Sequence, residues 1–483
     1  MRLLTSALAI ALLAAGCGET WNDPYPAAAA AGDVLYAAFV ARPKHLDPAL
    51  SYASDEAVFT QQVYEPPLQY HYLKRPYQLV PLTAAEMPRV TTLAGYSEYE
   101  IRIKPGIFYQ PHPAFARSTS GELLYQSLSP ARIAALASPY ALPGRGTREL
   151  TADDYIYEIK RLAQPRLASP IYGLMSQYIV GLPELAARLK QADAALSAEG
   201  RGGEWIDLRK YPLAGVERID AHSFRIRLKG RYPQFAYWLA MPFFAPVPWE
   251  VDRFFAQRGM AQKNFTLDWW PVGTGPYMLV ENNPNLRMVL ERNPNFRGEP
   301  YPSVGAPGDR AAGLLADAGK PMPFIDRIVY SREKESIPYW NKFLQGYYDT
   351  SGISSDNFDQ AVSVSVEGQA VLTPQMRSLG IQLRTAVAPS VFYIGFNWLD
   401  PVVGNALGGE GAERARKLRQ AISIAVDMEQ FLSIFANGRG IVAQGPIPAG
   451  IFGHRTGEEG IDPVTHVWRD GAAHRRPLAD ARR

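Results

Sequence analysis

Apolar and polar residues follow strand-like and helix-like periods over the first half of the chain. A near-continuous apolar run over residues 33–40 predicts a buried strand, and strict alternation over 99–103 and 222–228 predicts two half-buried strands. Helices are expected over 54–64 and from Thr151, where a Thr-Ala-Asp-Asp sequence supplies a cap and the following apolar residues fall on one stripe. The pattern therefore predicts a chain that mixes both kinds of element.

The second half of the chain continues this mixture. A glycine-containing turn over 271–277 is expected to enter a strand over 278–281, whose partner strand ends at 289–294. Residues 391–397 predict another buried strand, because they form a short run of apolar and aromatic residues. Residues 414–435 predict one long amphipathic helix with a single apolar face.

The first seventeen residues have the character of a secretory leader. A basic residue precedes an apolar run over 3–15, which is shorter than the roughly 20 residues that cross a bilayer. Cys17, the only cysteine, follows Leu-Ala-Ala-Gly and resembles the lipidated cysteine of a bacterial lipobox, with Ala14 where Leu is commoner. An ordinary leader with an incidental cysteine is the alternative. Residues 18–32, which contain two prolines, are expected to form a flexible tether.

Composition and motifs favour binding over catalysis. The 40 prolines and 40 glycines indicate many turns and an irregular α/β architecture, and a net charge of +3 is too small to indicate nucleic-acid binding. The sequence has no phosphate-binding loop, no H-E-x-x-H and no G-x-S-x-G, and its seven histidines are scattered. We therefore expect no enzyme, no cofactor and no metal site.

Several short motifs occur in an order that points to one family. The most specific are Val-Gly-Thr-Gly-Pro-Tyr at 272–277, followed by Leu-Glu-Arg-Asn-Pro at 290–294, and Arg-Gln-Ala-Ile-Ser-Ile-Ala-Val-Asp at 419–427. Supporting motifs stand at 46–49, 151–154, 323–328, 395–397 and 445–448. Taken together, this order resembles extracellular solute-binding protein family 5, the oligopeptide, dipeptide and nickel-binding group.

The resemblance implies two α/β lobes that close like a jaw over a ligand, with an extra domain inserted into the first lobe. It places lobe I at residues 33–64 and 206–318, the inserted domain at 65–205 and lobe II at 319–483. This is the two-lobed periplasmic binding-protein fold.

Three departures from the family are expected. Residues 111–150 and 183–210 are longer than compact members need, and residues 301–322 form a Gly/Ala/Pro-rich surface loop. The third departure is at the end, where residues 477–483 start as a helix and stop after about two turns without a cap. Related chains continue with the rest of the second lobe, including an aspartate segment that meets the ligand's amino group in peptide-binding members. We therefore expect lobe II to be incomplete at the C-terminus.

By the resemblance, the turn after the first strand borders the ligand cleft, as do the glycine turn and the end of the 391–397 strand. The ligand-binding candidates are therefore Lys44, His45, Ser51, Tyr52, Thr274, Asn397 and Trp398. Gly273 and Gly275 are expected to serve a turn that needs positive φ. Trp398 fits a core or hinge aromatic as well as a cleft wall.

The function that the resemblance implies is the substrate-binding component of an ABC importer. Such a protein captures a peptide-like solute between its lobes and delivers it to the permease subunits, and ligand binding stabilises the closed form. We expect a periplasmic monomer, anchored to the membrane by lipid on Cys17. The same fold could instead bind a sugar, glutathione, haem or nickel. A secreted hydrolase and a receptor or sensor are alternatives from other classes.

Overall fold

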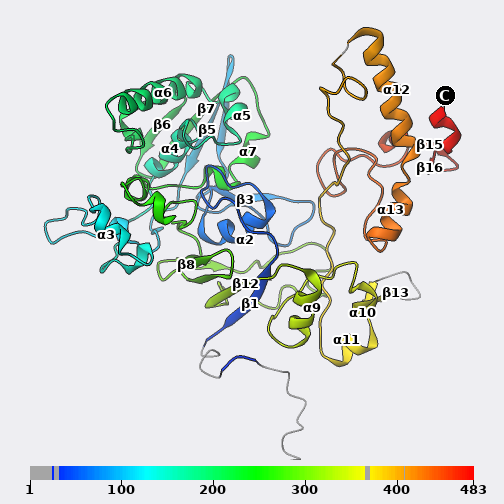
Figure 1. Ribbon diagram of the computed structural model, residues 1–483, viewed down its shortest axis with the longest axis horizontal. Coiled ribbons are helices and arrows are strands. Elements are labelled where there is room, and N and C mark those ends of the chain that lie inside the picture. Colours follow the sequence, from blue (N-terminus) through cyan, green and yellow to red (C-terminus); the bar gives the residue numbers. More distant parts are fainter. Residues whose placement is uncertain (1–23, 27–31, 365–369, 407, 483) are drawn as a thin grey trace, which may run out of the picture. The chain divides into compact units, whose positions relative to one another are not determined.

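The computed structural model describes residues 24–26, 32–364, 370–406 and 408–482 (Figure 1). The chain divides into two compact units. The first unit comprises residues 1–74 and 78–351, and the second comprises residues 75–77 and 352–483. The predicted leader over 1–17, Cys17 and most of the predicted tether lie outside the described residues.

One sheet of the first unit is built on the predicted first strand. Its four strands are, in order across the sheet, β1 (Val34–Phe39), β12 (Arg327–Arg332), β9 (Arg287–Arg292) and β8 (Tyr277–Asn283). β1 runs parallel to β12, and the other neighbours are antiparallel. Helix α2 (Ser54–Val63) packs against β8 and buries Phe59 and Val63 in a core cluster with Leu279 and Leu290. The strands expected over 33–40 and 278–281 and the helix expected over 54–64 are confirmed.

The second large sheet of the first unit is fully antiparallel. Its strands are, in order, β4 (Arg89–Leu93), β5 (Tyr96–Arg102), β7 (Ser223–Lys229) and β6 (Val216–Asp220). Ile101, Phe224 and Ile226 point into the larger core cluster, whereas the alternate Arg225 and Arg227 form ion pairs with glutamates of β5 on the other face. The predicted alternation over 99–103 and 222–228 is therefore confirmed, because each strand buries one face only.

Helices and short elements complete the first unit. Two longer helices besides α2 are α4 (Ala152–Arg161) and α6 (Leu182–Ala198). The Asp154 side chain accepts a hydrogen bond from the Thr151 backbone N–H (3.0 Å), as expected of a cap. Short helices are α3 (Pro130–Ala134), α5 (Tyr172–Tyr178), α7 (Phe235–Trp238), α8 (Trp249–Phe255) and α9 (Ser336–Leu344). Two-stranded sheets pair β2 (Leu68–Tyr70) with β3 (Leu79–Pro81) and β10 (Glu299–Pro300) with β11 (Pro321–Met322). 3-10 turns span Pro113–Phe115, Pro139–Ala141, Leu208–Lys210, Pro242–Phe244 and Ala261–Lys263.

The second unit contains smaller elements. Its helices are α10 (Phe358–Ala361), α11 (Pro374–Ser378), α12 (Gly409–Ala425) and α13 (Met428–Phe435). Its strands form two hairpin-like pairs, β13 (Val362–Val364) with β14 (Ala370–Leu372) and β15 (His466–Arg469) with β16 (Ala472–Arg475). 3-10 turns span Glu458–Gly460 and Leu478–Arg482.

Two sequence-based expectations for the second unit are wrong. Residues 391–397 form no strand, and the Phe392 side chain is 96% exposed, because no strand of the described chain pairs with this segment. The single helix expected over 414–435 is two helices, α12 and α13. Asp427 separates them, since its carboxylate accepts a hydrogen bond from the Gln430 backbone N–H (2.9 Å) and caps α13.

Among the residues that the structure describes, none of the helices has both the length and the apolar character needed to cross a membrane.

Candidate functional site

Four predicted ligand-binding residues lie in one loop, the β1–α2 loop (residues 40–53). Lys44 is exposed, His45 is partly exposed and Tyr52 is 71% exposed, whereas Ser51 is buried. The loop therefore presents three of the four side chains to solvent and turns the fourth inward.

The backbone of the β1–α2 loop is held although it has no regular secondary structure. Every backbone N–H from His45 to Ala53 donates a hydrogen bond, and Pro48 has no N–H to donate. Asp268 accepts from Leu46 (2.9 Å) and Asp47 (3.2 Å), and Glu56 accepts from His45 (3.0 Å), Tyr52 (3.0 Å) and Ala53 (3.1 Å). Asp47 accepts the remaining three bonds, from Ala49 through its carboxylate (2.9 Å) and from Leu50 (3.0 Å) and Ser51 (2.9 Å) through its carbonyl. The loop is thus ordered by the carboxylates of Glu56 and Asp268 and by the carboxylate and backbone carbonyl of Asp47.

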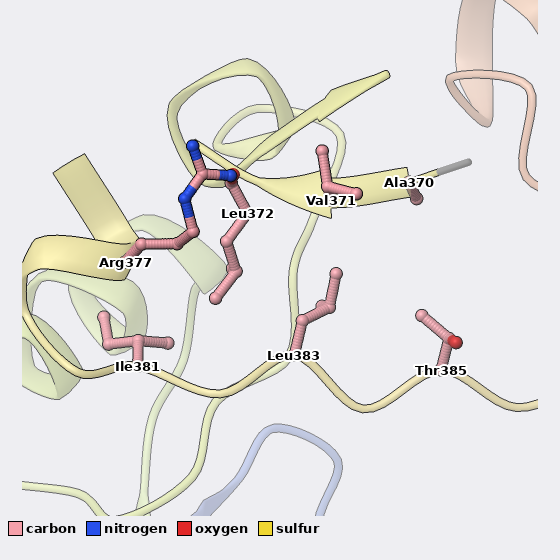
Figure 2. A pocket seen from close by; sticks show the side chains of 7 residues that line it. All are labelled: Ala370, Val371, Leu372, Arg377, Ile381, Leu383 and Thr385. Atoms are coloured by element: carbon pink, nitrogen blue, oxygen red, sulfur yellow. The ribbon is translucent and has the colours of Figure 1, made fainter. Parts of the chain in front are cut away.

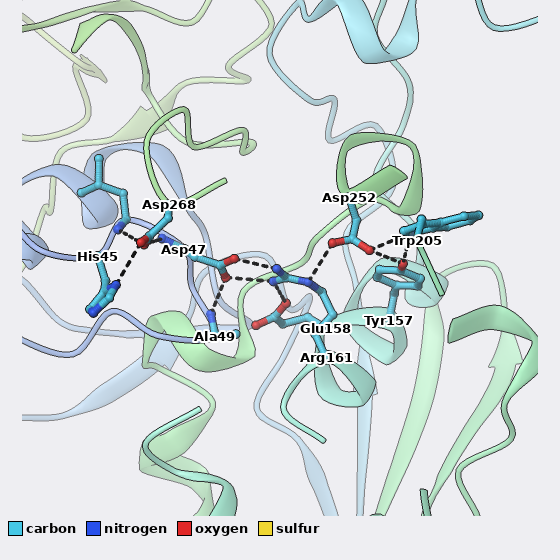
Figure 3. A network of polar contacts seen from close by, with 10 residues as sticks. His45, Asp47, Ala49, Tyr157, Glu158, Arg161, Trp205, Asp252 and Asp268 are labelled. Atoms are coloured by element: carbon cyan, nitrogen blue, oxygen red, sulfur yellow. Dashed lines mark hydrogen bonds and ion pairs between the residues drawn. The ribbon is translucent and has the colours of Figure 1, made fainter. Parts of the chain in front are cut away.

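Asp47 is fixed in turn by a buried arginine at the end of α4. The two Arg161 terminal nitrogens donate to the two carboxylate oxygens of Asp47 at 2.9 and 2.6 Å, a bidentate pair. Arg161 also donates to Glu158 (2.8 Å), and its Nε lies 3.4 Å from a carboxylate oxygen of Asp252. Figure 3 shows the guanidinium between Asp47 on one side and Asp252 on the other, with Glu158 beside it.

The network extends beyond this arginine at both ends. Asp252 accepts hydrogen bonds from the Tyr157 hydroxyl (2.6 Å) and the Trp205 indole N–H (2.9 Å). At the other end, the His45 ring nitrogen Nδ1 lies 3.0 Å from the Asp268 carboxylate (Figure 3). The polar contacts therefore run from the β1–α2 loop to Trp205, which is half-buried.

Burial and charge pairing compete in this network, with opposite outcomes at Glu158 and Arg161. Burial raises the pKa of the Glu158 carboxyl well above its usual range, and the positive charge of Arg161 opposes that shift only in part. Burial alone would lower the pKa of the Arg161 guanidinium, but Asp47 and Glu158 outweigh it and hold that pKa well above its usual range. Because charges in a low-dielectric interior need partners, loss of any one member leaves the others uncompensated.

Thr274 lies in a second buried network of the first unit. Its hydroxyl donates to Glu65 (2.8 Å), which also accepts from Arg297 (2.7 Å). Burial raises the pKa of Glu65, opposed by the hydrogen bond from Arg297. Neither Gly273 nor Gly275 has positive φ, so that expectation is wrong. These glycines are needed for close approach instead, since a Cβ on Gly273 would lie 1.9 Å from the Val63 carbonyl oxygen.

Asn397 and Trp398 belong to the second unit. The Asn397 side chain accepts a hydrogen bond from the Leu399 backbone N–H (3.1 Å), which shapes a local turn. The Trp398 ring is 56% exposed and lies under the Arg419 guanidinium, 4.3 Å from the ring centroid. Arg419 also donates to the Val403 carbonyl (2.6 Å), so helix α12 and this turn are held together.

The second unit also has a hollow that contains none of the predicted site residues. Its volume is about 460 Å³, and its lining residues are Ala370, Val371, Leu372, Arg377, Ile381, Leu383 and Thr385. Figure 2 shows strand β14 on one side and the extended segment that carries Ile381 and Leu383 on the other. Five of the seven lining residues are aliphatic, and the one charged group, Arg377, donates to the Leu372 carbonyl (2.7 Å). Such a lining can hold an apolar group, and its seven residues include no His, Cys, Lys, Asp or Glu side chain that could act as a general base.

Sequence reasoning missed the side chains that hold the β1–α2 loop, chiefly Glu56, Arg161 and Asp268. Asp47 itself stands in one of the supporting motifs, and that was the available signal. Its partner Arg161 is 114 residues away along the chain, so no local pattern links them. Within the described part of the chain, no group of three or more His, Cys, Asp or Glu side chains is placed to hold a metal ion.

Comparisons with known proteins agree on one kind of relative. The family model described as "Bacterial extracellular solute-binding proteins, family 5 Middle" matches residues 146–465. The periplasmic oligopeptide-binding protein OppA of Salmonella typhimurium is 32% identical over 149 residues, which cover 30% of this chain and 23% of OppA. The OppA of Escherichia coli is 30% identical over 151 residues, with the same coverage.

Solved structures of low sequence identity have a similar fold. The periplasmic binding protein DppA of Helicobacter pylori, in complex with the peptide STSA, is 14% identical with a TM-score of 0.53, and the match covers 94% of this chain and 66% of DppA. The murein tripeptide binding protein MppA of Escherichia coli is 15% identical with a TM-score of 0.53, covering 90% of this chain and 63% of MppA. The chain thus spans slightly less than two thirds of each of these structures. The predicted fold class, a two-lobed α/β periplasmic binding protein, is confirmed.

Proposed function

The chain belongs to family 5 of the bacterial extracellular solute-binding proteins, and on that premise we propose that it captures a peptide-like solute for an ABC importer. The observation that carries the proposal is the family match over residues 146–465. The relatives support the ligand class, since OppA is named an oligopeptide-binding protein and the DppA structure contains a peptide. Family members bind solutes and are not enzymes, so capture and release form the proposed activity.

The β1–α2 loop supports this proposal physically. A buried peptide backbone must exchange its hydrogen bonds to water for bonds to protein. Because its backbone N–H groups already have acceptors, the loop would meet a ligand through its side chains, and its pre-organised backbone would lower the entropic cost of binding. Lys44, His45 and Tyr52 are its outward side chains, and we keep them as proposed contacts together with Ser51, Thr274, Asn397 and Trp398.

We also propose where the protein works. Its OppA relatives are periplasmic, and we assign this chain to the same compartment, with the permease subunits of an importer as its partners. Lipid on Cys17 would anchor it to a membrane, and the body would act as a monomer. Mass spectrometry of the protein from its native membrane tests the anchor, since diacylglyceryl on Cys17 is expected and an unmodified or cleaved cysteine contradicts it.

The experiment that tests the ligand class is native mass spectrometry of the purified full chain. A peptide is expected to co-purify with the wild-type chain. The Tyr52→Ala variant should lose this peptide but stay folded, because Tyr52 is exposed. Tyr96→Ala is the matched control, since Tyr96 is an exposed tyrosine on β5, away from the β1–α2 loop. A sugar, haem or nickel ion in place of a peptide would contradict the ligand class.

A further inference from the structure

The β1–α2 loop has three anchors, and only one of them lies within the loop itself. Glu56 belongs to α2, and Asp268 belongs to a distant segment of the first unit. Asp47 stands in the middle of the loop and accepts the N–H groups of Ala49, Leu50 and Ser51. An anchor inside a loop moves with the loop unless something outside holds it, and Arg161 is the group that holds Asp47.

Arg161 is well placed to hold this carboxylate rigidly. It is the last residue of α4, where a cation is favoured by the partial negative charge of the helix C-terminus. Its guanidinium makes two parallel bonds to Asp47, and its side chain is only 2% exposed. A planar, fully ionised fork fixes both the distance and the plane of the carboxylate, which a single ammonium cannot do.

A second arginine of the first unit, Arg148, shows that such a pair need not serve the loop, although its side chain is 23% exposed and that of Arg161 only 2%. Arg148 makes short bidentate bonds to Asp154 (2.8 and 2.6 Å) and to Glu250 (2.8 and 2.8 Å). Both partners lie outside the β1–α2 loop, on α4 and α8. Arg148 and Arg161 therefore share their chemistry and differ in what they hold.

We propose that Arg161 is a positioning residue for solute capture, which acts by clamping Asp47 and so fixing the β1–α2 loop that presents Lys44, His45 and Tyr52. The inference rests on the proposed function, since it assigns this loop to the solute. Beyond the proposed function, it states that a residue outside the loop, at the end of α4, fixes the geometry of the loop. Affinity is then set partly by a residue that never touches the ligand.

The test compares three variants of the full chain, Arg161→Lys, Asp47→Asn and the control Arg148→Lys. Lysine keeps the charge at either site but loses the fork. Hydrogen–deuterium exchange of residues 45–53 measures how well the loop amides are protected. Calorimetric titration with trialanine, trilysine and triglutamate measures the dissociation constant. In Arg161→Lys, exchange of the Ala49, Leu50 and Ser51 amides should rise about tenfold, because they depend on Asp47, and the dissociation constant should rise by a similar factor.

Asp47→Asn should reproduce both effects from the loop side, and it decides the matter if Arg161→Lys fails to fold. Arg148→Lys should leave loop exchange and the dissociation constant at wild-type values, even if it lowers the melting temperature. Unchanged loop exchange in both Arg161→Lys and Asp47→Asn overturns the proposal, as does faster exchange with unchanged affinity. If the wild-type chain binds none of the tripeptides, the proposed function fails, whereas the exchange data alone still decide whether Arg161 holds the loop.

Discussion

The two compact units treat their large apolar side chains differently. In the first unit, such side chains pack into two core clusters, and phenylalanines such as Phe59 and Phe254 have no exposed surface. In the second unit, Phe392, Tyr393 and Leu399 are each more than four fifths exposed. The contrast shows that an apolar pattern specifies an element only when the described chain supplies something for it to pack against.

The largest expected difference between the units is in how much the free energy of unfolding falls when an aromatic ring is removed. Phe254→Ala should lower the free energy of unfolding by about 3–5 kcal/mol, because it empties a fully enclosed site. Phe392→Ala should change it by less than about 0.5 kcal/mol, because the ring is exposed. Urea unfolding measured by circular dichroism gives both values. Equal costs would mean that the second unit buries Phe392 in solution.

A smaller difference is expected when a methyl group is added to the backbone. Gly273→Ala should lower the free energy of unfolding by about 1–3 kcal/mol, because the added Cβ would lie 1.9 Å from the Val63 carbonyl oxygen. Gly395→Ala, in the second unit, meets only the Tyr393 ring at 3.7 Å and should be within about 0.5 kcal/mol of wild type. Thermal unfolding of the two variants measures the difference, and a tolerated Gly273→Ala would show that the contact between Val63 of α2 and the turn at Gly273 is looser than described.

The smallest expected effect is a pH dependence confined to the first unit. Burial lowers the pKa of His112 from 6.5 to about 3, so the unfolded chain binds a proton that the folded chain rejects. Stability is therefore intact above pH 6.5 and falls as the pH drops toward 3, by about 1 kcal/mol between pH 7 and pH 5.5.

His112→Asn should remove that part of the pH dependence, since asparagine does not titrate in this range. Chemical unfolding of wild type and variant at pH 7 and pH 5.5 isolates the contribution. An identical pH dependence in both proteins would mean that His112 is not buried as a neutral ring.

The sequence predicts the helices and strands of the first unit better than those of the second unit. The strands at Val34–Phe39 and Ser223–Lys229 were predictable, because their apolar residues meet partners elsewhere in the first unit. The strand over 391–397 was not, since its pattern is strand-like but the described chain gives it no neighbour. The break before α13 could have been predicted, because Asp427 is a better helix cap than an interior helix residue.

The candidate site was predictable only in part. The β1–α2 loop and its outward residues followed from position after the first strand and from family resemblance. Its anchors did not, because the bonds from Arg161 to Asp47 and from Leu46 to Asp268 join residues more than a hundred positions apart. Such contacts depend on the folded topology, and a single sequence carries no local record of them.

The central claim is that this chain captures a peptide-like solute, and isothermal titration of the purified wild-type chain tests it most directly. Short peptides should bind with a measurable dissociation constant, and glutathione, haem, nickel and simple sugars should not. Tight binding of one of those solutes, with no heat from any peptide, would contradict the account.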